Sequence, residues 1–347
     1  MSKLVIDKRA PFFFFLSCFL VLIVANRGDT PDTFVYYYIF NHIDSYNLKS
    51  FSDFYSATGV ELGYGWYAYI VSLLTNSENF LFGLYSAINF LMLYLILRKF
   101  NKKITVLSLL IYASGPFFFM QQFMQMRQGL AVLLALYAII TLFQDRKFST
   151  FIIFSGLAMM MHQVSIALIS LSFLFYVFFN KIEISKRNFL LLAIPYFFIL
   201  TFLFKYVFVS VLMGVSGRLE DYYYSSYNYS VGILSLPNLK SYLLCIFVLF
   251  FSKKEMYLNR YFVFLMFLLI TSVACRIGFS DFAILSGRFS TVFGFVEVIL
   301  FPFIMYELFN NKVWVYISIF IISICQLYIT LNFQAPYLID NYFTPLY

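Results

Sequence analysis

Residues 121–140 read QQFMQMRQGLAVLLALYAII, and this stretch decides the class of fold. An apolar run of helical length begins at Gly129, yet Arg127 and Gln128 stand directly before it. Of the 347 residues, 62% are hydrophobic and 12% charged, whereas a soluble domain carries about 25% charged residues. Similar apolar runs recur from end to end. We therefore predict an all-α, polytopic membrane protein, because a lipid-embedded backbone must satisfy its own hydrogen bonds.

The apolar runs predict eleven membrane helices in a single integral-membrane domain spanning residues 1–347. Their predicted ranges are 11–26, 79–97, 104–120, 129–144, 147–161, 163–179, 188–204, 239–252, 260–275, 291–309 and 313–331. Clusters of Lys and Arg favour the cytoplasmic side and place the N-terminus inside. The segment 64–75 is too short to span, so we expect an outer interfacial or re-entrant helix there.

A shortened helical hairpin is predicted over residues 147–179. Its ends, near Lys147 and Lys181, are both expected on the cytoplasmic side, so the chain between them crosses twice. Each arm has about 15 residues, or about 22 Å of helix, against a hydrocarbon core of about 30 Å. The turn at 161–165, which contains His162, should therefore lie below the outer surface.

Two long stretches, 27–78 and 205–238, are predicted to be outer, periplasmic loops, and the first contains the interfacial helix. Sixteen of the 24 basic residues fall inside and eight outside, yet each group contains five arginines. The outer arginines are Arg27, Arg127, Arg218, Arg276 and Arg288. Orientation alone does not require arginine on the outer face, whereas bidentate recognition of phosphate or carboxylate does. We therefore expect the functional site on this face.

Several classes of protein and site are disfavoured by composition and motifs. The four cysteines, Cys18, Cys245, Cys275 and Cys325, have no CxxC or Cys/His spacing, so neither a disulfide nor a metal site is predicted. The net charge of +8 need not indicate nucleic acid, because membrane proteins gather basic residues on the cytoplasmic side. Walker A, HExxH, GxSxG and Rossmann motifs are missing, and no cofactor is predicted.

Arginines near outer helix ends are the candidates for binding an anion. Arg127, followed by Gln128, is predicted at the start of a helix, where exposed N–H groups and the helix dipole favour a phosphate. Arg288 is likewise predicted to begin a helix, and Arg218, like Arg288, follows a glycine. The alternative for each arginine is a side chain that reaches the lipid headgroups. The evidence that Arg276 binds an anion is weaker, because this residue can simply mark the end of its helix.

Acids and a histidine are the candidates for proton transfer. Glu61, in GVELGYGWY, could act as a general base or orient an arginine, or could simply stabilise a helix N-terminus. His162 could accept a proton from a hydroxyl or pair with a phosphate, or could hydrogen-bond at a helix turn. Asp32 and Asp29 follow the first helix, where acids also build ordinary turns.

Other polar residues have their own interpretations. His42 is expected to be a solvated surface residue. Glu297 is predicted two turns inside the tenth helix, protonated and hydrogen-bonded to a neighbour. Tyr222 and Tyr223 belong to a tyrosine-rich run at 222–229 that suits either a membrane interface or the faces of sugar rings.

The order of these motifs resembles the Wzy-type O-antigen polymerases, in the branch that groups with EpsG-like exopolysaccharide proteins. Acids after the first helix are followed by E-x-G-Y at Glu61, R-Q-x-L-A at Arg127, and the hairpin histidine with Ser165. An outer loop with arginine and tyrosine and R-F at Arg288 complete the order. The sequence departs from the pattern at Leu62, where proline is common, and in the distance between His162 and Ser165.

The resemblance implies an enzyme that joins oligosaccharide units carried on undecaprenyl pyrophosphate at the periplasmic face of the bacterial inner membrane. It also implies an architecture similar to lipid-linked, GT-C-like membrane glycosyltransferases. Arg127, Gln128, Arg218, Arg288, Tyr222 and Tyr223 would then bind substrate, and Glu61, His162 or Asp32 would serve the acceptor hydroxyl. The implied partners are the lipid-linked oligosaccharide, as donor and acceptor, and membrane lipid. A chain-length regulator is left open.

Two other classes of function remain open at this point. The first is a transporter of the same lipid-linked units, although the polar residues crowd one face and no strong internal repeat is present. The second is a related membrane transferase, either an O-antigen ligase or an acyltransferase. A ligase uses the same donor, so the residues alone separate it poorly from a polymerase.

Overall fold

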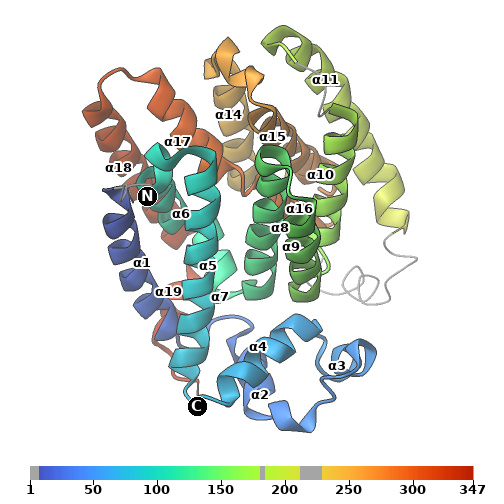
Figure 1. The fold of residues 1–347 in the computed structure, drawn as a ribbon, viewed down its shortest axis with the longest axis vertical. Helices are drawn as coiled ribbons and strands as arrows, with labels where there is room; N and C mark the ends of the chain where they lie inside the picture. Colours follow the sequence, from blue (N-terminus) through green and yellow to red (C-terminus); the bar gives the residue numbers. More distant parts are fainter. Residues whose placement is uncertain (1–7, 180–183, 212–228, 347) are drawn as a thin grey trace, which may run out of the picture. The chain divides into compact units, whose positions relative to one another are not determined.

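The computed structural model describes residues 8–179, 184–211 and 229–346. Every regular element in these ranges is a helix, which confirms the predicted all-α class. The chain divides into two units: unit 1 comprises residues 1–170 and 309–347, and unit 2 comprises residues 171–308 (Figure 1). The single membrane domain and the periplasmic placement of 27–78 and 205–238 stay predictions.

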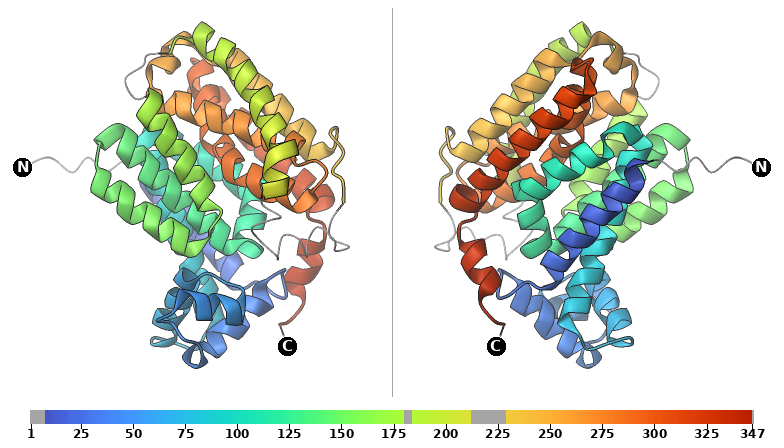
Figure 2. Two further views of the ribbon diagram at one scale, coloured as in Figure 1. Left: turned by 90° about the vertical axis from the view of Figure 1, so that its right-hand side faces the viewer. Right: turned by 90° about the vertical axis from the view of Figure 1, so that its left-hand side faces the viewer.

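Unit 1 is built from the N-terminal helices and from the last two helices of the chain. Its helices are α1 (Arg9–Ala25), α2 (Thr33–Asn41), α3 (Phe51–Thr58), α4 (Leu62–Ser72), α5 (Glu78–Asn101), α6 (Thr105–Ser114), α7 (Pro116–Phe123), α8 (Met126–Asp145), α9 (Phe148–Met161), α18 (Lys312–Ile329) and α19 (Tyr337–Phe343). Figures 1 and 2 show α1 packed beside α5, and α18 packed beside α6.

Three short helices, α2, α3 and α4, fill the first predicted outer loop. Only α4 corresponds to a predicted helix. Helix α3 begins at Ser50, whose side chain accepts the N–H of Asp53, and ends at Gly59, whose φ of 67° suits glycine. The three helices lie at the end of unit 1 where α8 begins and α9 ends (Figure 1). They therefore form a cap over that end of the unit.

The segment predicted as one helix over 104–120 is broken into α6 and α7. The break lies at Gly115 and Pro116, and Pro116 takes the first position of α7. Proline lacks the N–H that a continuous helix would need, and it disfavours helical backbone in the residue before it. Helix α7 then leads through Met124 and Gln125 into α8. We call residues 121–128 the α7–α8 elbow.

Unit 2 contains α11 (Lys186–Leu203), α14 (Leu236–Phe251), α15 (Arg260–Gly278), α16 (Ala283–Gly294) and α17 (Glu297–Leu308). Helix α10 (Ser165–Phe179) runs across the division between the two units. Helices α16 and α17 are bent by 43° at residues 295–296. The prediction of one helix over 291–309 is therefore wrong, because the helical chain begins at Ala283 and breaks before Glu297.

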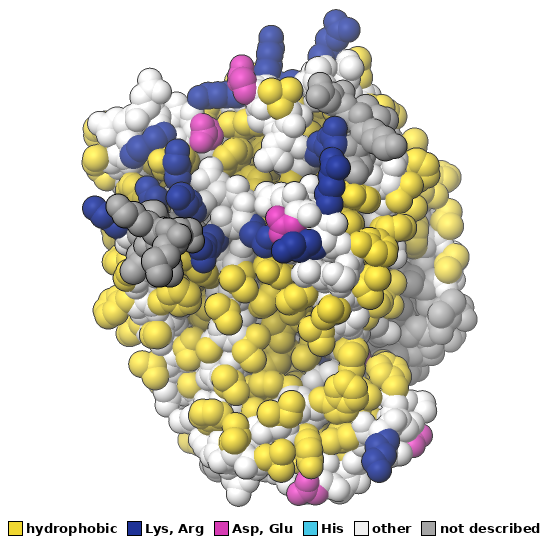
Figure 3. All heavy atoms as spheres, in the orientation of Figure 1, with side chains coloured by type: hydrophobic (Ala, Val, Ile, Leu, Met, Phe, Trp, Pro, Cys, Tyr) yellow, Lys and Arg dark blue, Asp and Glu magenta, His cyan; other side chains and the backbone are white. Residues whose placement is uncertain are grey.

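All eleven predicted apolar segments are helical, although two of them are broken. Among the described residues, five helical stretches are long and apolar enough to cross a membrane, and the bent pair α16–α17 makes a sixth if it is one span. Helices α1, α9, α10 and α14 are apolar but shorter. Hydrophobic side chains cover much of the face seen in Figure 3. Such a surface suits contact with lipid, so the protein is a multi-pass membrane protein.

Candidate functional site

Glu61 and Arg127 form an ion pair in unit 1. Glu61 is the residue directly before α4, and its side chain makes no capping bond to that helix. Its Oε2 instead accepts a hydrogen bond from Nη1 of Arg127, in the first turn of α8. Glu61 is 2% exposed. A carboxylate so buried needs a charged partner, and Arg127 supplies it.

The tip of the hairpin formed by α9 and α10 reaches the same carboxylate. The backbone N–H of Gln163 donates to Oε1 of Glu61 at 3.2 Å. Nδ1 of His162 lies 3.8 Å from that oxygen. The structure thus brings Glu61, Arg127 and His162 together from three separate segments, and we call these three side chains the Glu61 cluster.

The tautomer of His162 follows from its nearest backbone contact. Nδ1 of His162 accepts the N–H of Val164 at 3.2 Å, so in the neutral ring the proton resides on Nε2. In this state Nε2 is a donor rather than a base. His42 has the opposite arrangement, because its Nδ1 lies 2.9 Å from the carbonyl oxygen of Tyr38 and must donate to it. His42 is exposed, which confirms the sequence interpretation.

We expect the two histidines to differ in the ring nitrogen that carries the proton. With two histidines in the chain, 15N-histidine labelling gives two sets of imidazole signals, which His42→Gln would assign. At a pH where both rings are neutral, solid-state NMR should show Nε2–H for His162 and Nδ1–H for His42. A protonated Nδ1 on His162 would contradict the contact with Val164.

Tyrosines support Arg127 from the side of α2. Nε of Arg127 donates to the hydroxyl oxygen of Tyr36 at 3.3 Å, and Tyr64 donates its hydroxyl to the carbonyl oxygen of Tyr36 at 2.9 Å. Burial raises the pKa of Tyr64, so its phenol remains a neutral donor. With Nη1 on Glu61 and Nε on Tyr36, Nη2 of Arg127 has no hydrogen-bond partner within the described residues. This edge of the guanidinium can bind a ligand.

Gly63 sets the distance between α4 and the hairpin. A Cβ on Gly63 would lie 2.5 Å from the carbonyl oxygen of Met160, which is backbone and cannot move aside alone. Glu61 stands two residues before this contact and Gln163 three residues after it. The close approach therefore lets the N–H of Gln163 reach the carboxylate.

Gly63→Ala should separate α4 from α9, lower the thermal midpoint of the purified protein and reduce activity in cells. Gly156→Ala is the matched control, because this glycine of α9 has no heavy atom within 4 Å of its Cβ position. Alanine inside a helix is favoured over glycine by about 1 kcal/mol, so the control should be as stable as the wild type or more so. Equal stability of the two variants would show that the contact at Met160 does not position Glu61.

The other residues predicted for the site have different outcomes. Gln128 follows Arg127 in α8 and is buried. Asp32 precedes α2 with a φ of 65° and is exposed, so its carboxylate lies at the surface while that of Glu61 is buried. Arg218, Tyr222 and Tyr223 lie outside the described residues.

In unit 2, two charged residues lie at other helix positions than the sequence predicts. Arg288 lies in the middle of α16 rather than at the start of a helix, because α16 begins five residues earlier, at Ala283. Glu297 is the first residue of α17, and its Oε1 accepts a hydrogen bond from Nζ of Lys240 at 2.6 Å. The buried Glu297 is therefore paired with Lys240 at the start of a helix, rather than lying two turns inside one as the sequence predicts.

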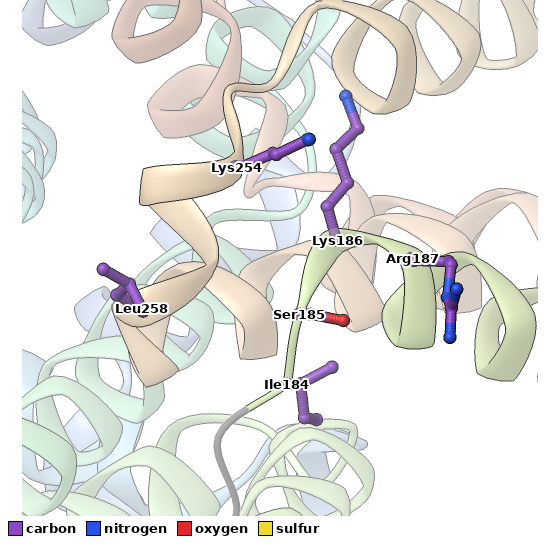
Figure 4. A pocket seen from close by; sticks show the side chains of 6 residues that line it. All are labelled: Ile184, Ser185, Lys186, Arg187, Lys254 and Leu258. Carbon is purple, nitrogen blue, oxygen red and sulfur yellow. The ribbon is translucent and has the colours of Figure 1, made fainter.

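A shallow cavity of about 400 Å³ lies in unit 2. Its lining residues are Ile184, Ser185, Lys186, Arg187, Lys254 and Leu258 (Figure 4). They supply three cations and a hydroxyl, but neither a carboxylate nor an imidazole for proton transfer. Among the described residues, no three His, Cys, Asp or Glu side chains are grouped to hold a metal ion. The Glu61 cluster is therefore the better candidate.

Sequence reasoning missed Tyr36 and the backbone of Gln163 as parts of the site, and it named Tyr64 only as the last residue of the E-x-G-Y motif, without a role. Tyr36 stands in the run TFVYYYIF, where aromatic residues also suit a membrane interface. Nothing in that run distinguishes Tyr36 from Tyr37 or Tyr38. Only the packing of α2 against α4 selects it.

Comparison with known proteins identifies the family of this chain. Neither curated proteins nor solved structures include a significant match to the sequence. The model of the EpsG family matches residues 11–345, which is nearly the whole chain and includes every member of the Glu61 cluster. The chain therefore belongs to the EpsG family of polysaccharide-polymerase-like membrane proteins.

Proposed function

We propose that the protein is a glycosyltransferase that polymerises oligosaccharide units carried on undecaprenyl pyrophosphate, as in O-antigen synthesis. The observation that carries this proposal is the Glu61 cluster, in which a buried carboxylate holds an arginine whose Nη2 edge is open to a ligand. Membership of the EpsG family supports the same class of reaction. The active face is proposed to be the periplasmic side of the inner membrane.

The reaction needs a site for the departing phosphate and a group that accepts a proton. The acceptor hydroxyl attacks the anomeric carbon, the bond from that carbon to the phosphate oxygen breaks, and the lipid pyrophosphate leaves with the bonding electrons. Nη2 of Arg127 would stabilise the growing negative charge on the phosphate. As Arg127 binds the phosphate, its ion pair with Glu61 weakens. The carboxylate of Glu61 then becomes a better acceptor for the hydroxyl proton.

In this proposal His162 acts as a hydrogen-bond donor and not as a general base. With its proton on Nε2, the ring would donate a hydrogen bond to a phosphate or sugar oxygen, since Nδ1 accepts the N–H of Val164. Arg218, Arg288, Tyr222 and Tyr223 stay proposed as further substrate contacts, together with Gln128. Asp32 stays a proposed alternative base, acting from the surface.

A strain that lacks the gene would test this function through its lipopolysaccharide, separated on a gel. Loss of the ladder with retention of core carrying a single repeat unit would establish polymerisation. Bare core would place the defect at or before ligation and favour a flippase or a ligase. An unchanged ladder in a strain without a second polymerase gene would contradict the proposal.

A further inference from the structure

Arg27 is a buried cation without an acidic partner. It follows α1 and is 5% exposed. Its Nε donates to the carbonyl oxygen of Val24 at 3.2 Å, and its Nη1 contacts Sδ of Met126 at 3.2 Å, which is a weak acceptor. Nη2 is buried and has no hydrogen-bond partner among residues 8–179, 184–211 and 229–346. Within the described residues, no carboxylate lies within ion-pair distance of this guanidinium.

The charge of Arg27 remains despite burial. Burial lowers its pKa to about 9, an effect that the nearby phenols of Tyr36, Tyr64 and Tyr67 partly offset. At neutral pH the side chain is therefore still a cation. The rings of Phe82 and Phe123 lie 4.2 and 5.3 Å from its Cζ, and cation–π attraction offsets part of the cost of desolvation. It does not replace the opposite charge that buried ions normally have.

More unpartnered polar groups lie in the α7–α8 elbow. Gln121 is 2% exposed, and neither its Oε1 nor its Nε2 has a hydrogen-bond partner in the part of the chain that the structure describes. Oε1 of Gln125 is likewise buried without one. Buried polar atoms normally have hydrogen-bond partners, so several unpartnered ones in one elbow point to a polar ligand there.

The elbow connects Arg27 with the Glu61 cluster. Phe123 and Met126, which contact Arg27, both belong to the elbow, and Arg127 is the residue after Met126. Tyr36 receives the hydrogen bond from Arg127 and also lies near Arg27. The two guanidinium groups therefore flank one short stretch of chain, and Glu61 neutralises Arg127 alone.

We propose that Arg27 is the second cation of a pyrophosphate site, in which Arg127 binds one phosphate and Nη2 of Arg27 binds the other. This inference rests on the proposed function and adds to it a preference for one class of lipid phosphate. Two cations at the elbow select a lipid pyrophosphate over a lipid monophosphate, because the monophosphate leaves Arg27 without its counter-charge.

Binding of soluble lipid phosphates to the purified full-length protein tests this proposal. The probes are farnesyl pyrophosphate and farnesyl monophosphate, and the measurement is the thermal midpoint as a function of probe concentration. The wild type should prefer the pyrophosphate by about tenfold or more, as expected for one additional charge-assisted contact. Arg27→Met should lose this preference, yet without a probe it should unfold no earlier than the wild type, since methionine fills the volume without a buried charge.

Matched variants distinguish a binding role from a structural one. Arg98→Met removes an exposed arginine of α5 and should keep the preference for pyrophosphate. If Arg27→Met also keeps it, the proposal is wrong. If Arg27→Met does not fold, Arg27→Lys decides, because lysine retains the charge but loses the planar fork of donors. A weakened preference in Arg27→Lys supports the proposal, and an unchanged preference overturns it.

The gel assay on the gene-deletion strain separates the two proposals. A pyrophosphate preference that depends on Arg27, together with an unchanged ladder, would keep the binding site and reject polymerisation. A lost ladder with equal binding of both probes to the wild type would keep polymerisation and reject the role of Arg27.

Discussion

Arg127→Ala should abolish the lipopolysaccharide ladder, with polymerisation reduced by about 100-fold or more, as for the loss of one donor from a charged transition state. The variant removes the guanidinium edge that is open to the departing phosphate. It also leaves Glu61, which is 2% exposed, without its counter-charge. That second effect should destabilise the protein by about 3–5 kcal/mol, so the loss of activity in Arg127→Ala combines two causes.

A double variant separates these causes. Glu61→Gln combined with Arg127→Gln removes both charges and leaves two amides that can hydrogen-bond to each other. Its thermal midpoint should lie close to that of the wild type, while the ladder stays absent. A stable double variant that still makes a full ladder would show that Arg127 serves only to neutralise Glu61.

The second large effect is expected in unit 2, at the pair of Lys240 and Glu297. Lys240→Met should lower the free energy of unfolding by about 3 kcal/mol, because Glu297 would remain buried as an unpaired carboxylate. The lower end of the usual range applies, since the side chain of Lys240 is 28% exposed and Arg276 lies near Glu297. The thermal midpoint of the purified protein measures the effect.

Adding Glu297→Gln to Lys240→Met should recover most of the lost stability, since the double variant buries no charge. Lys49→Met, at an exposed lysine, is the control and should change the midpoint little. If Lys240→Met alone leaves the midpoint unchanged, the pair of Lys240 and Glu297 does not stabilise the fold, which is the result expected for the protonated acid that the sequence predicts.

The apolar segments could be predicted because a membrane requires a long uninterrupted run of hydrophobic residues, which is a local property. The same reasoning placed Arg127 at the start of a helix and His162 at the turn of a short hairpin. It failed for α2 and α3, whose mixed aromatic and polar residues make no such run. It also placed Arg288, which follows a glycine, at a helix start, whereas α16 begins at Ala283 and continues through that glycine.

The pairing within the site could not be predicted, because it joins distant parts of the chain. Glu61 and Arg127 are separated by 66 residues, and Glu61 and Gln163 by 102. Sequence spacing says which side chains carry charge but not which of them is buried beside another. Arg27 illustrates this point. Nothing in the sequence distinguishes it from the other four outer arginines, whereas the structure shows it buried between two phenylalanine rings.

The short length of α9 has a consequence for the surrounding lipid. Its 14 residues extend for only about 21 Å, well below the thickness of an ordinary hydrocarbon core. A bilayer adapts to such hydrophobic mismatch by thinning beside the helix or by letting water follow its end inward. A hydrocarbon layer of uniform thickness would therefore not describe the surroundings of His162 at the end of a membrane-spanning α9. Acyl-chain length would then affect the proposed activity, because thicker lipids would cost more to deform around the hairpin that completes the Glu61 cluster.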